Sequence, residues 1–251
     1  MSKQYFMGEE KMRLDQVLVA RGMIETRTKA SDLIKEGLVK VNNHPILKPS
    51  QSINLDDEIL VEQKSFPWVS RGAKKLVFAI ENFGINPKDK IVFDLGASTG
   101  GFTEVSLKYE AKKVYAIDVG HDQLHQKLKS DSRVCELSGL DVRKINDFNL
   151  PNPEWIVADL SFISLVKALP VVIRKAIWGA TMICLIKPQF ELSKKQIGKN
   201  GVVKSKVLRE CAVSNVADFL GKENWSVVGT KSSPILGRSG NQEFLMLAIK
   251  K

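Results

Sequence analysis

The sequence predicts an α/β protein in which a large domain, built on a mostly parallel sheet, follows a small α+β domain. From Lys74 onward, helical segments alternate with short apolar runs, which is typical of a parallel sheet covered on both faces. Residues 12–61 have a different rhythm of two short helices and several short strands. A chain of 251 residues is long enough for both domains. We therefore expect a small domain at residues 12–62, a linker at 63–72 and a large domain at 73–251.

Capping and turn residues define the elements of the small domain. A first helix is expected from Met12 to Gly22, because glycine commonly ends a helix. A second helix is capped by Thr26 or Thr28 and runs to Gly37. The strands are expected at 38–41, at Ile53 and at 59–61, with a tight turn at Asn42-Asn43.

Short runs of apolar and β-branched residues mark the strands of the large domain. A helix at 73–83 precedes the first strand, and a helix at 102–109 follows it. Helical segments separate all the strands except the last two, which follow each other through a loop. The strands are expected at 91–94, 114–118, 134–137, 155–159, 182–186, 226–229 and 244–249.

The first of these strands leads directly into a glycine-rich loop. In the segment DLGASTGGF, residues 94–102, three glycines allow positive φ angles and a close approach of the backbone to a ligand. The spacing D-x-G-x-x-x-G differs from the G-x-G-x-x-G of a dinucleotide site, since a carboxylate opens it. A carboxylate at this point suits a ligand that carries an ammonium group. The segment resembles the first motif of the class I S-adenosylmethionine (SAM) methyltransferases.

Ionisable side chains recur where the strands of the large domain end. They are Asp94, Asp118, Asp141, Asp159 and Lys187. A single Asp at such a position is more often a helix cap, but the carboxyl ends of parallel strands share one edge, where open α/β sheets bind ligands. Asp118 is placed to accept from ribose hydroxyls, and Asp141 to accept from an adenine amino group. The predicted SAM-binding residues are Asp94, Gly96, Ala97, Ser98, Gly100, Gly101, Phe102, Asp118 and Asp141.

Charge and composition restrict the class of protein. The net charge is +10, and residues 65–251 carry the whole excess, with 28 Lys and Arg against 18 Asp and Glu. Such a charge favours polyanionic partners such as RNA. No run of 18 apolar residues occurs and the N-terminus is too charged for a secretory signal, so we expect a cytoplasmic protein without stable membrane insertion. The three cysteines and three histidines show no spacing typical of a disulfide framework or a metal site.

The segment from Arg13 to Val61 resembles, almost end to end, a small RNA-binding domain named after a ribosomal small-subunit protein. The resemblance implies that the basic face of the second helix binds RNA phosphates. Without it, a solvated helix face is an equal alternative for these cations. The RNA-binding residues that it predicts are Arg13, Arg21, Arg27, Lys29 and Lys35, and we expect Arg71 of the linker to bind RNA as well.

Five motifs together resemble the TlyA-type family over nearly the whole chain. They are SRGAKKL (70–76), DLGASTGGFTE (94–104), ADLSFISL (158–165), LIKPQFE (185–191) and GRSGNQEFLM (237–246). Members are described as hemolysins and as ribosomal RNA 2′-O-methyltransferases with an FtsJ-like catalytic domain. The resemblance implies a sheet whose final strand is antiparallel, SAM as cofactor and ribosomal RNA or ribosomal subunits as partner. The FtsJ-like Lys-Asp-Lys-Glu tetrad corresponds to Lys75, Asp159, Lys187 and Glu243, with Lys74 as a competitor for Lys75.

The chemistry of 2′-O-methylation supports this assignment. A ribose 2′-hydroxyl is a poor nucleophile and must lose or share its proton as it attacks a sulfonium methyl group. A lysine held amid carboxylates can be oriented, and neighbouring cations can make it a base. We expect Lys187 to be that base, Asp159 and Glu243 to orient the lysines, and Lys75 to set the electrostatics and position the ribose.

Two other functions remain alternatives. The first is a membrane-active hemolysin, as the family name suggests, although no amphipathic membrane helix is evident in the sequence. The second is an RNA-binding protein with an inert methyltransferase fold, which the intact tetrad disfavours. In the linker, Phe66 and Trp68 are expected either to dock on a domain surface or to stack on a base.

Overall fold

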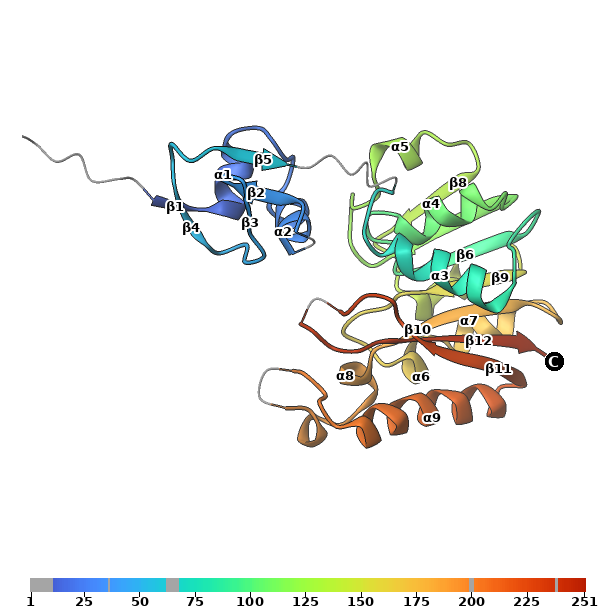
Figure 1. The fold of residues 1–251 in the computed structure, drawn as a ribbon. Coiled ribbons are helices and arrows are strands. Elements are labelled where there is room, and N and C mark those ends of the chain that lie inside the picture. Colours follow the sequence, from blue (N-terminus) through green and yellow to red (C-terminus); the bar gives the residue numbers. More distant parts are fainter. Residues whose placement is uncertain (1–10, 36, 62–67, 199–200, 238) are drawn as a thin grey trace, which may run out of the picture. The chain divides into compact units, whose positions relative to one another are not determined.

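The computed structural model describes residues 11–35, 37–61, 68–198, 201–237 and 239–251 (Figure 1). The chain forms two compact units that divide between Pro67 and Trp68. Residues 63–67 of the predicted linker, including Phe66, lie outside the described residues. Trp68 packs against the core of the second unit. Within the described ranges, no helix has both the length and the apolar character that crossing a membrane requires.

The small unit begins with a strand and two short helices. These elements are β1 (Lys11–Arg13), α1 (Leu14–Ala20) and α2 (Arg27–Lys35). The prediction of a helix from Met12 is wrong, because Met12 pairs with Ile53 of the antiparallel strand β4 (Ser52–Asn54). Gly22 follows α1 with a φ of +67°, which only glycine adopts without cost. Thr26, rather than Thr28, precedes α2, and its Oγ1 accepts from the Lys29 N–H at 3.3 Å.

A second, three-stranded sheet completes this unit. It has the order β3 (His44–Pro45), β2 (Val39–Val41), β5 (Ile59–Val61), and both pairings are antiparallel. The predicted turn at Asn42-Asn43 is present, with φ angles of 49° and 65°. A strand is also present at the predicted Ile53, but this strand, β4, pairs with β1 and not with β2. The core contains Leu14, Val17, Leu18, Ala30, Ile34, Val39, Val41 and Ile53.

The large unit is built on a seven-stranded sheet of order β11-β12-β10-β9-β6-β7-β8. The strands from β10 to β8 run parallel, whereas β12 lies antiparallel between β10 and β11. The predicted fold class, a mostly parallel sheet whose last strand is antiparallel, is confirmed. The strands are β6 (Ile91–Leu95), β7 (Lys113–Asp118), β8 (Val134–Ser138), β9 (Trp155–Ala158), β10 (Thr181–Ile186), β11 (Trp225–Ser232) and β12 (Phe244–Lys250).

Helices cover both faces of this sheet (Figure 1). Successive strand residues point to opposite faces, so Val92 packs with α3 and α4 while Phe93 packs with α6, α7 and α9. Burial of each such side chain contributes about 1.5–3 kcal/mol, which makes the sheet a firm platform for its carboxyl edge. The helical segments are α3 (Ala73–Phe83), α4 (Gly101–Lys108), α5 (Gln126–Lys129), η1 (Val142–Asp147), α6 (Leu165–Ala168), α7 (Pro170–Lys175), α8 (Pro188–Glu191), η2 (Lys194–Gln196) and α9 (Lys206–Lys222).

Candidate active site and cofactor pocket

Four ionisable side chains from separate segments meet at the carboxyl edge of the large sheet. Lys75 Nζ lies 2.7 Å from Glu243 Oε2 and 3.5 Å from Asp159 Oδ2. Lys187 Nζ lies 2.6 Å from Asp159 Oδ1. The four groups thus form one chain, Glu243–Lys75–Asp159–Lys187, with alternating charges.

The sheet topology explains why these residues converge. Asp159 and Lys187 follow the parallel neighbours β9 and β10, so their backbones leave the sheet side by side. Glu243 instead precedes β12, and because β12 is antiparallel its amino end lies at that same edge. Lys75 enters from the first turn of α3.

Burial makes the balance of charge in this cluster important. Lys75, Lys187 and Glu243 are less than one-tenth exposed. Burial of Asp159 would raise the pKa of its carboxyl group, but the ammonium groups of Lys75 and Lys187 outweigh burial and hold that pKa below its usual value. Removing one member would leave an uncompensated charge in a poorly hydrated site.

Lys75, and not Lys74, is the lysine in this cluster. Lys74 lines a separate groove with Trp68, Phe78 and Pro234. The two side chains leave α3 in different directions because adjacent helical residues are rotated by about 100°.

Sequence reasoning missed two residues beside Lys187. Ser161 Oγ accepts a hydrogen bond from Lys187 Nζ at 2.7 Å. Phe162 has a φ of +65°, is 91% exposed and lies with its ring centroid 5.4 Å from that of Phe190. The available signal was their position in the loop that Asp159 opens, since residues after a strand of the sheet lie at the same edge. A hydrophobic pattern with the period of a strand or a helix could not reveal the hydrogen bond of Ser161 or the ring contact of Phe162.

Asp94 is the penultimate residue of strand β6 and is fully buried. Its Oδ2 accepts from Thr103 Oγ1 at 2.6 Å, whereas Oδ1 has no hydrogen-bond partner among the described residues. Burial raises the pKa of Asp94 to about 7, although the Thr103 hydrogen bond acts in the opposite direction. A buried carboxylate oxygen without a donor is the feature expected where a ligand supplies a cationic donor.

The glycine loop connects Asp94 with the charged cluster. Gly96 has a φ of +82°, and a Cβ atom there would lie 2.8 Å from the Asp159 carbonyl oxygen. Gly100, with a φ of +96°, opens α4, and a Cβ there would collide with Leu128 and Leu124. A side chain at Gly96 would therefore push the loop away from the segment that carries Asp159.

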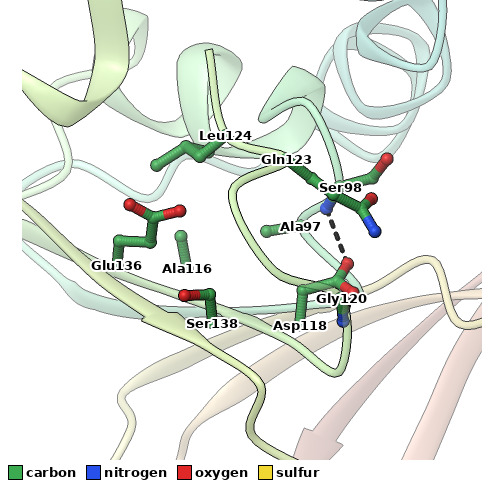
Figure 2. Close-up of a pocket in the computed structure, with 9 residues that line it drawn as sticks. All are labelled: Ala97, Ser98, Ala116, Asp118, Gly120, Gln123, Leu124, Glu136 and Ser138. Atoms are coloured by element: carbon green, nitrogen blue, oxygen red, sulfur yellow. Dashed lines mark hydrogen bonds between the residues drawn. The ribbon is translucent and has the colours of Figure 1, made fainter. Parts of the chain in front are cut away.

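A cavity lies beside this loop, and Figure 2 shows the side chains around it. Asp118 accepts from the Ser98 N–H and the Gly120 N–H, each at 2.8 Å, and so ties the loop to the end of β7. Glu136, which we did not predict, also lines the cavity because its strand position lies opposite Ala116. The lining residues are Ala97, Ser98, Ala116, Asp118, Gly120, Gln123, Leu124, Glu136 and Ser138.

Of the nine predicted SAM-binding residues, only Ala97, Ser98 and Asp118 are part of that lining. Asp94, Gly96, Gly100 and Gly101 belong to the neighbouring strand end, glycine loop and helix start, whereas Phe102 and Asp141 make other contacts. Phe102 is buried in the core on the α3 and α4 side of the sheet. Asp141 caps η1 by accepting from the Arg143 N–H at 2.9 Å, and it also binds the Arg143 guanidinium. The Arg143 hydrogen bonds hold the pKa of Asp141 below its usual value.

The predicted RNA-binding cations of the small unit are exposed, but several have protein partners. The buried carboxylate of Asp15 binds Arg13 at 2.8 Å and Arg27 at 3.3 Å, and it thereby holds two guanidinium groups together. Arg21 donates to the carbonyl oxygens of Leu55 and Asp57. Lys29 pairs with Glu25, and Lys35 ends α2. Arg71 belongs to the other unit, just before α3.

Metal-ligating side chains do not gather in the part of the chain that the structure describes. There, no three or more His, Cys, Asp and Glu side chains are arranged to hold a metal ion. The charged cluster contains two lysines, which would repel a cation.

Both units of the chain are similar to known protein families. Residues 68–250 match the FtsJ-like methyltransferase family, and residues 12–59 match the S4 domain. The 16S/23S rRNA (cytidine-2'-O)-methyltransferase TlyA of Mycobacterium tuberculosis is 41% identical over 93% of this chain and 88% of that protein. Hemolysin A of Brachyspira hyodysenteriae is 40% identical over 93% of this chain and 98% of that protein. A solved structure of a hemolysin-named protein from Streptococcus thermophilus has a TM-score of 0.76 and 38% identity, over 97% of this chain and 90% of that chain.

Proposed function

The chain belongs to the TlyA-type family of FtsJ-like methyltransferases with an S4 domain, and from this premise we propose that it methylates a ribose 2′-hydroxyl of ribosomal RNA, with SAM as methyl donor. The observation that carries the proposal is the buried chain Glu243–Lys75–Asp159–Lys187. It supplies an amine held between oriented charges, which is what activation of a weakly acidic hydroxyl requires. A ribosomal RNA substrate also implies a cytoplasmic location.

The residues beside the glycine loop fit SAM. Asp94 Oδ1, which has no hydrogen-bond partner among the residues that the structure describes, would accept from the ammonium group of the methionine part of SAM. The carboxylate oxygens of Asp118 have further lone pairs for ribose hydroxyls, and the lining by Ala97, Ala116 and Leu124 suits an apolar ring face. When bound, SAM supplies a sulfonium-activated methyl group. Glycine at position 96 keeps this pocket close to Asp159.

In its neutral form, Lys187 would take the proton that the ribose hydroxyl loses as the hydroxyl oxygen bonds to the methyl carbon and the bond from that carbon to the sulfonium sulfur breaks. Asp159 keeps Lys187 in place, and Lys75 stabilises Asp159 while Glu243 balances Lys75. Much of the rate enhancement comes from holding the hydroxyl and the methyl group in line, so small displacements of Lys187 are costly.

Features outside the tetrad support an RNA substrate. The exposed ring of Phe162 lies against Phe190 next to Lys187, and exposed aromatic rings bind unpaired bases by stacking. The arginines around Asp15 form a compact positive group suited to phosphates. The arrangement of the tetrad disfavours an inert fold. The relative named as a methyltransferase is 41% identical to this chain and the relative named hemolysin A is 40% identical. The hemolysin name therefore gives the hemolysin alternative no advantage.

The direct test is to incubate purified unmethylated ribosomal subunits with the protein and labelled SAM, and to map 2′-O-methylated nucleotides. We expect new methylation with the wild-type protein and none with Lys187→Ala, which should retain SAM binding by calorimetry. Lys222→Ala, an exposed lysine at the end of α9, is the matched control and should stay active. An inactive wild-type protein, or full activity of Lys187→Ala, would refute the proposal.

A further inference from the structure

Lys187 is held by two side chains of the loop after β9, and they hold it in different ways. Asp159 Oδ1 lies 2.6 Å from Lys187 Nζ as an ion pair. Ser161 Oγ accepts an aligned hydrogen bond from the same nitrogen at 2.7 Å. With one acceptor, an amine can still rotate so that its second N–H bond and its lone pair exchange places, whereas two acceptors fix both N–H bonds. The rotation of the Lys187 amine therefore depends on Ser161 as well as on Asp159.

That rotation matters for a base. A neutral amine carries two N–H bonds and one lone pair, and the lone pair must face the hydroxyl that gives up its proton. When one N–H bond points at Ser161 and the Asp159 carboxylate attracts the other, the lone pair takes the remaining position. Without the Ser161 acceptor, the amine can rotate and direct an N–H bond to the place where the lone pair is needed.

The position of Ser161 is itself fixed by a second set of contacts between the same two loops. Glu191 lies four residues after Lys187, at the end of α8. Its Oε2 accepts from Ser164 Oγ at 2.6 Å and its Oε1 accepts from the Leu165 N–H at 2.9 Å. The segment of Ser161 to Leu165 is thus bound to the Lys187 segment at both of its ends.

We infer that Ser161 is a positioning residue that aims the lone pair of Lys187 at the ribose hydroxyl, and that Glu191 holds the Ser161 loop in place for it. This inference rests on the proposed function. Neither residue belongs to the tetrad. Ser161 is exposed, so its replacement should not disturb the core.

The test compares Ser161→Ala with Ser161→Thr in steady-state methylation of ribosomal subunits. Ser161→Ala should lower kcat roughly 10- to 100-fold, as expected for a misaligned reacting group. KM for SAM and for RNA should change less than about twofold, because Ser161 binds neither. Ser161→Thr restores the hydroxyl and should recover most of kcat. Ser214→Ala, an exposed serine on α9, is the control and should keep wild-type kcat.

A double-mutant cycle tests the part played by Glu191. Glu191→Gln should lower kcat less than Ser161→Ala does, and Ser161→Ala/Glu191→Gln should be no slower than Ser161→Ala alone, because both changes act on Lys187 by one route. Wild-type kcat in Ser161→Ala would overturn the inference for Ser161, and fully additive losses would overturn it for Glu191. Both results are distinct from failure of the proposed function, which appears in the same assay as an inactive wild-type protein or an active Lys187→Ala.

Discussion

Lys75 Nζ lies 2.7 Å from Glu243 Oε2, although the two residues are 168 positions apart in the sequence. The contact joins the first helix of the large unit to the start of its last strand. Both side chains are buried, so removal of one partner would leave the other as an uncompensated buried charge. Loss of either partner should therefore have effects on folding that can be separated from effects on catalysis.

We expect Glu243→Ala to lower the free energy of unfolding by about 3 kcal/mol, because it leaves the Lys75 ammonium buried without its nearest partner. Lys75→Met/Glu243→Leu should recover most of this loss, since it removes both buried charges, but it should not methylate RNA. Urea unfolding of the single and double variants measures both effects. The exposed Lys88–Glu110 pair is the control, and Lys88→Ala should unfold like wild type. Equal stability of Glu243→Ala and wild type would show that the buried pair is not needed for folding.

SAM affinity should rise with pH because Asp94 must be ionised to pair with an ammonium group. The raised pKa of about 7 means that the neutral acid persists to higher pH than for an ordinary Asp. At this pKa the carboxylate fraction grows from about 9% at pH 6 to about 50% at pH 7. Calorimetry should therefore give about fivefold tighter SAM binding at pH 7 than at pH 6, a range below the ordinary α-amino pKa. Asp94→Asn should bind SAM more weakly and without this dependence, and a wild-type affinity independent of pH would contradict the assigned role.

The family resemblance grouped the four residues of the tetrad, and sheet topology explains why their side chains meet. Asp159 and Lys187 each follow a strand, Glu243 precedes one and Lys75 lies on the helix before the first strand of the large sheet. Contacts between particular side chains and strands decided the features that the sequence analysis did not predict correctly. Asp141 is bound by Arg143, and residues 11–13 form a strand because Met12 pairs with Ile53 rather than starting a helix. Such choices depend on tertiary partners that periodicity does not encode.

Ser161 illustrates the same limit within the site. Its side chain lies in an irregular loop whose course depends on the positive φ of Phe162 and on the contacts of Glu191. The motif ADLSFISL contains both Ser161 and Ser164, but it does not state which hydroxyl meets Lys187. The fold distinguishes the two serines, because Ser161 accepts from Lys187 whereas Ser164 donates to Glu191.

Phe162→Ala should weaken use of the RNA substrate while leaving the cofactor alone. Base stacking on an aromatic ring contributes about 1–3 kcal/mol, so kcat/KM for ribosomal subunits should fall roughly 5- to 150-fold. SAM affinity should not change, since Phe162 does not line the cofactor cavity. Trp178→Ala removes another exposed ring, before β10 at the opposite edge of the sheet, and should behave as wild type. Equal losses in both variants would point to general surface effects and against stacking at Phe162.

Arg27→Ala should reduce RNA affinity through one phosphate contact. Arg27 binds Asp15 at 3.3 Å, whereas Arg13 binds the same carboxylate at 2.8 Å, so loss of Arg27 leaves the tighter pair intact and the small unit folded. Removing one phosphate contact should reduce the magnitude of the slope of log K against log salt by roughly 0.7–0.9 and weaken binding of different RNA sequences equally. Filter binding over a salt series measures the slope. Arg133→Ala is the matched control, because Arg133 is likewise paired with a carboxylate, that of Asp131, but lies before β8 in the other unit, and its loss should leave the slope unchanged. A slope for Arg27→Ala equal to that of wild type would show that Arg27 makes no phosphate contact and that its role ends with Asp15.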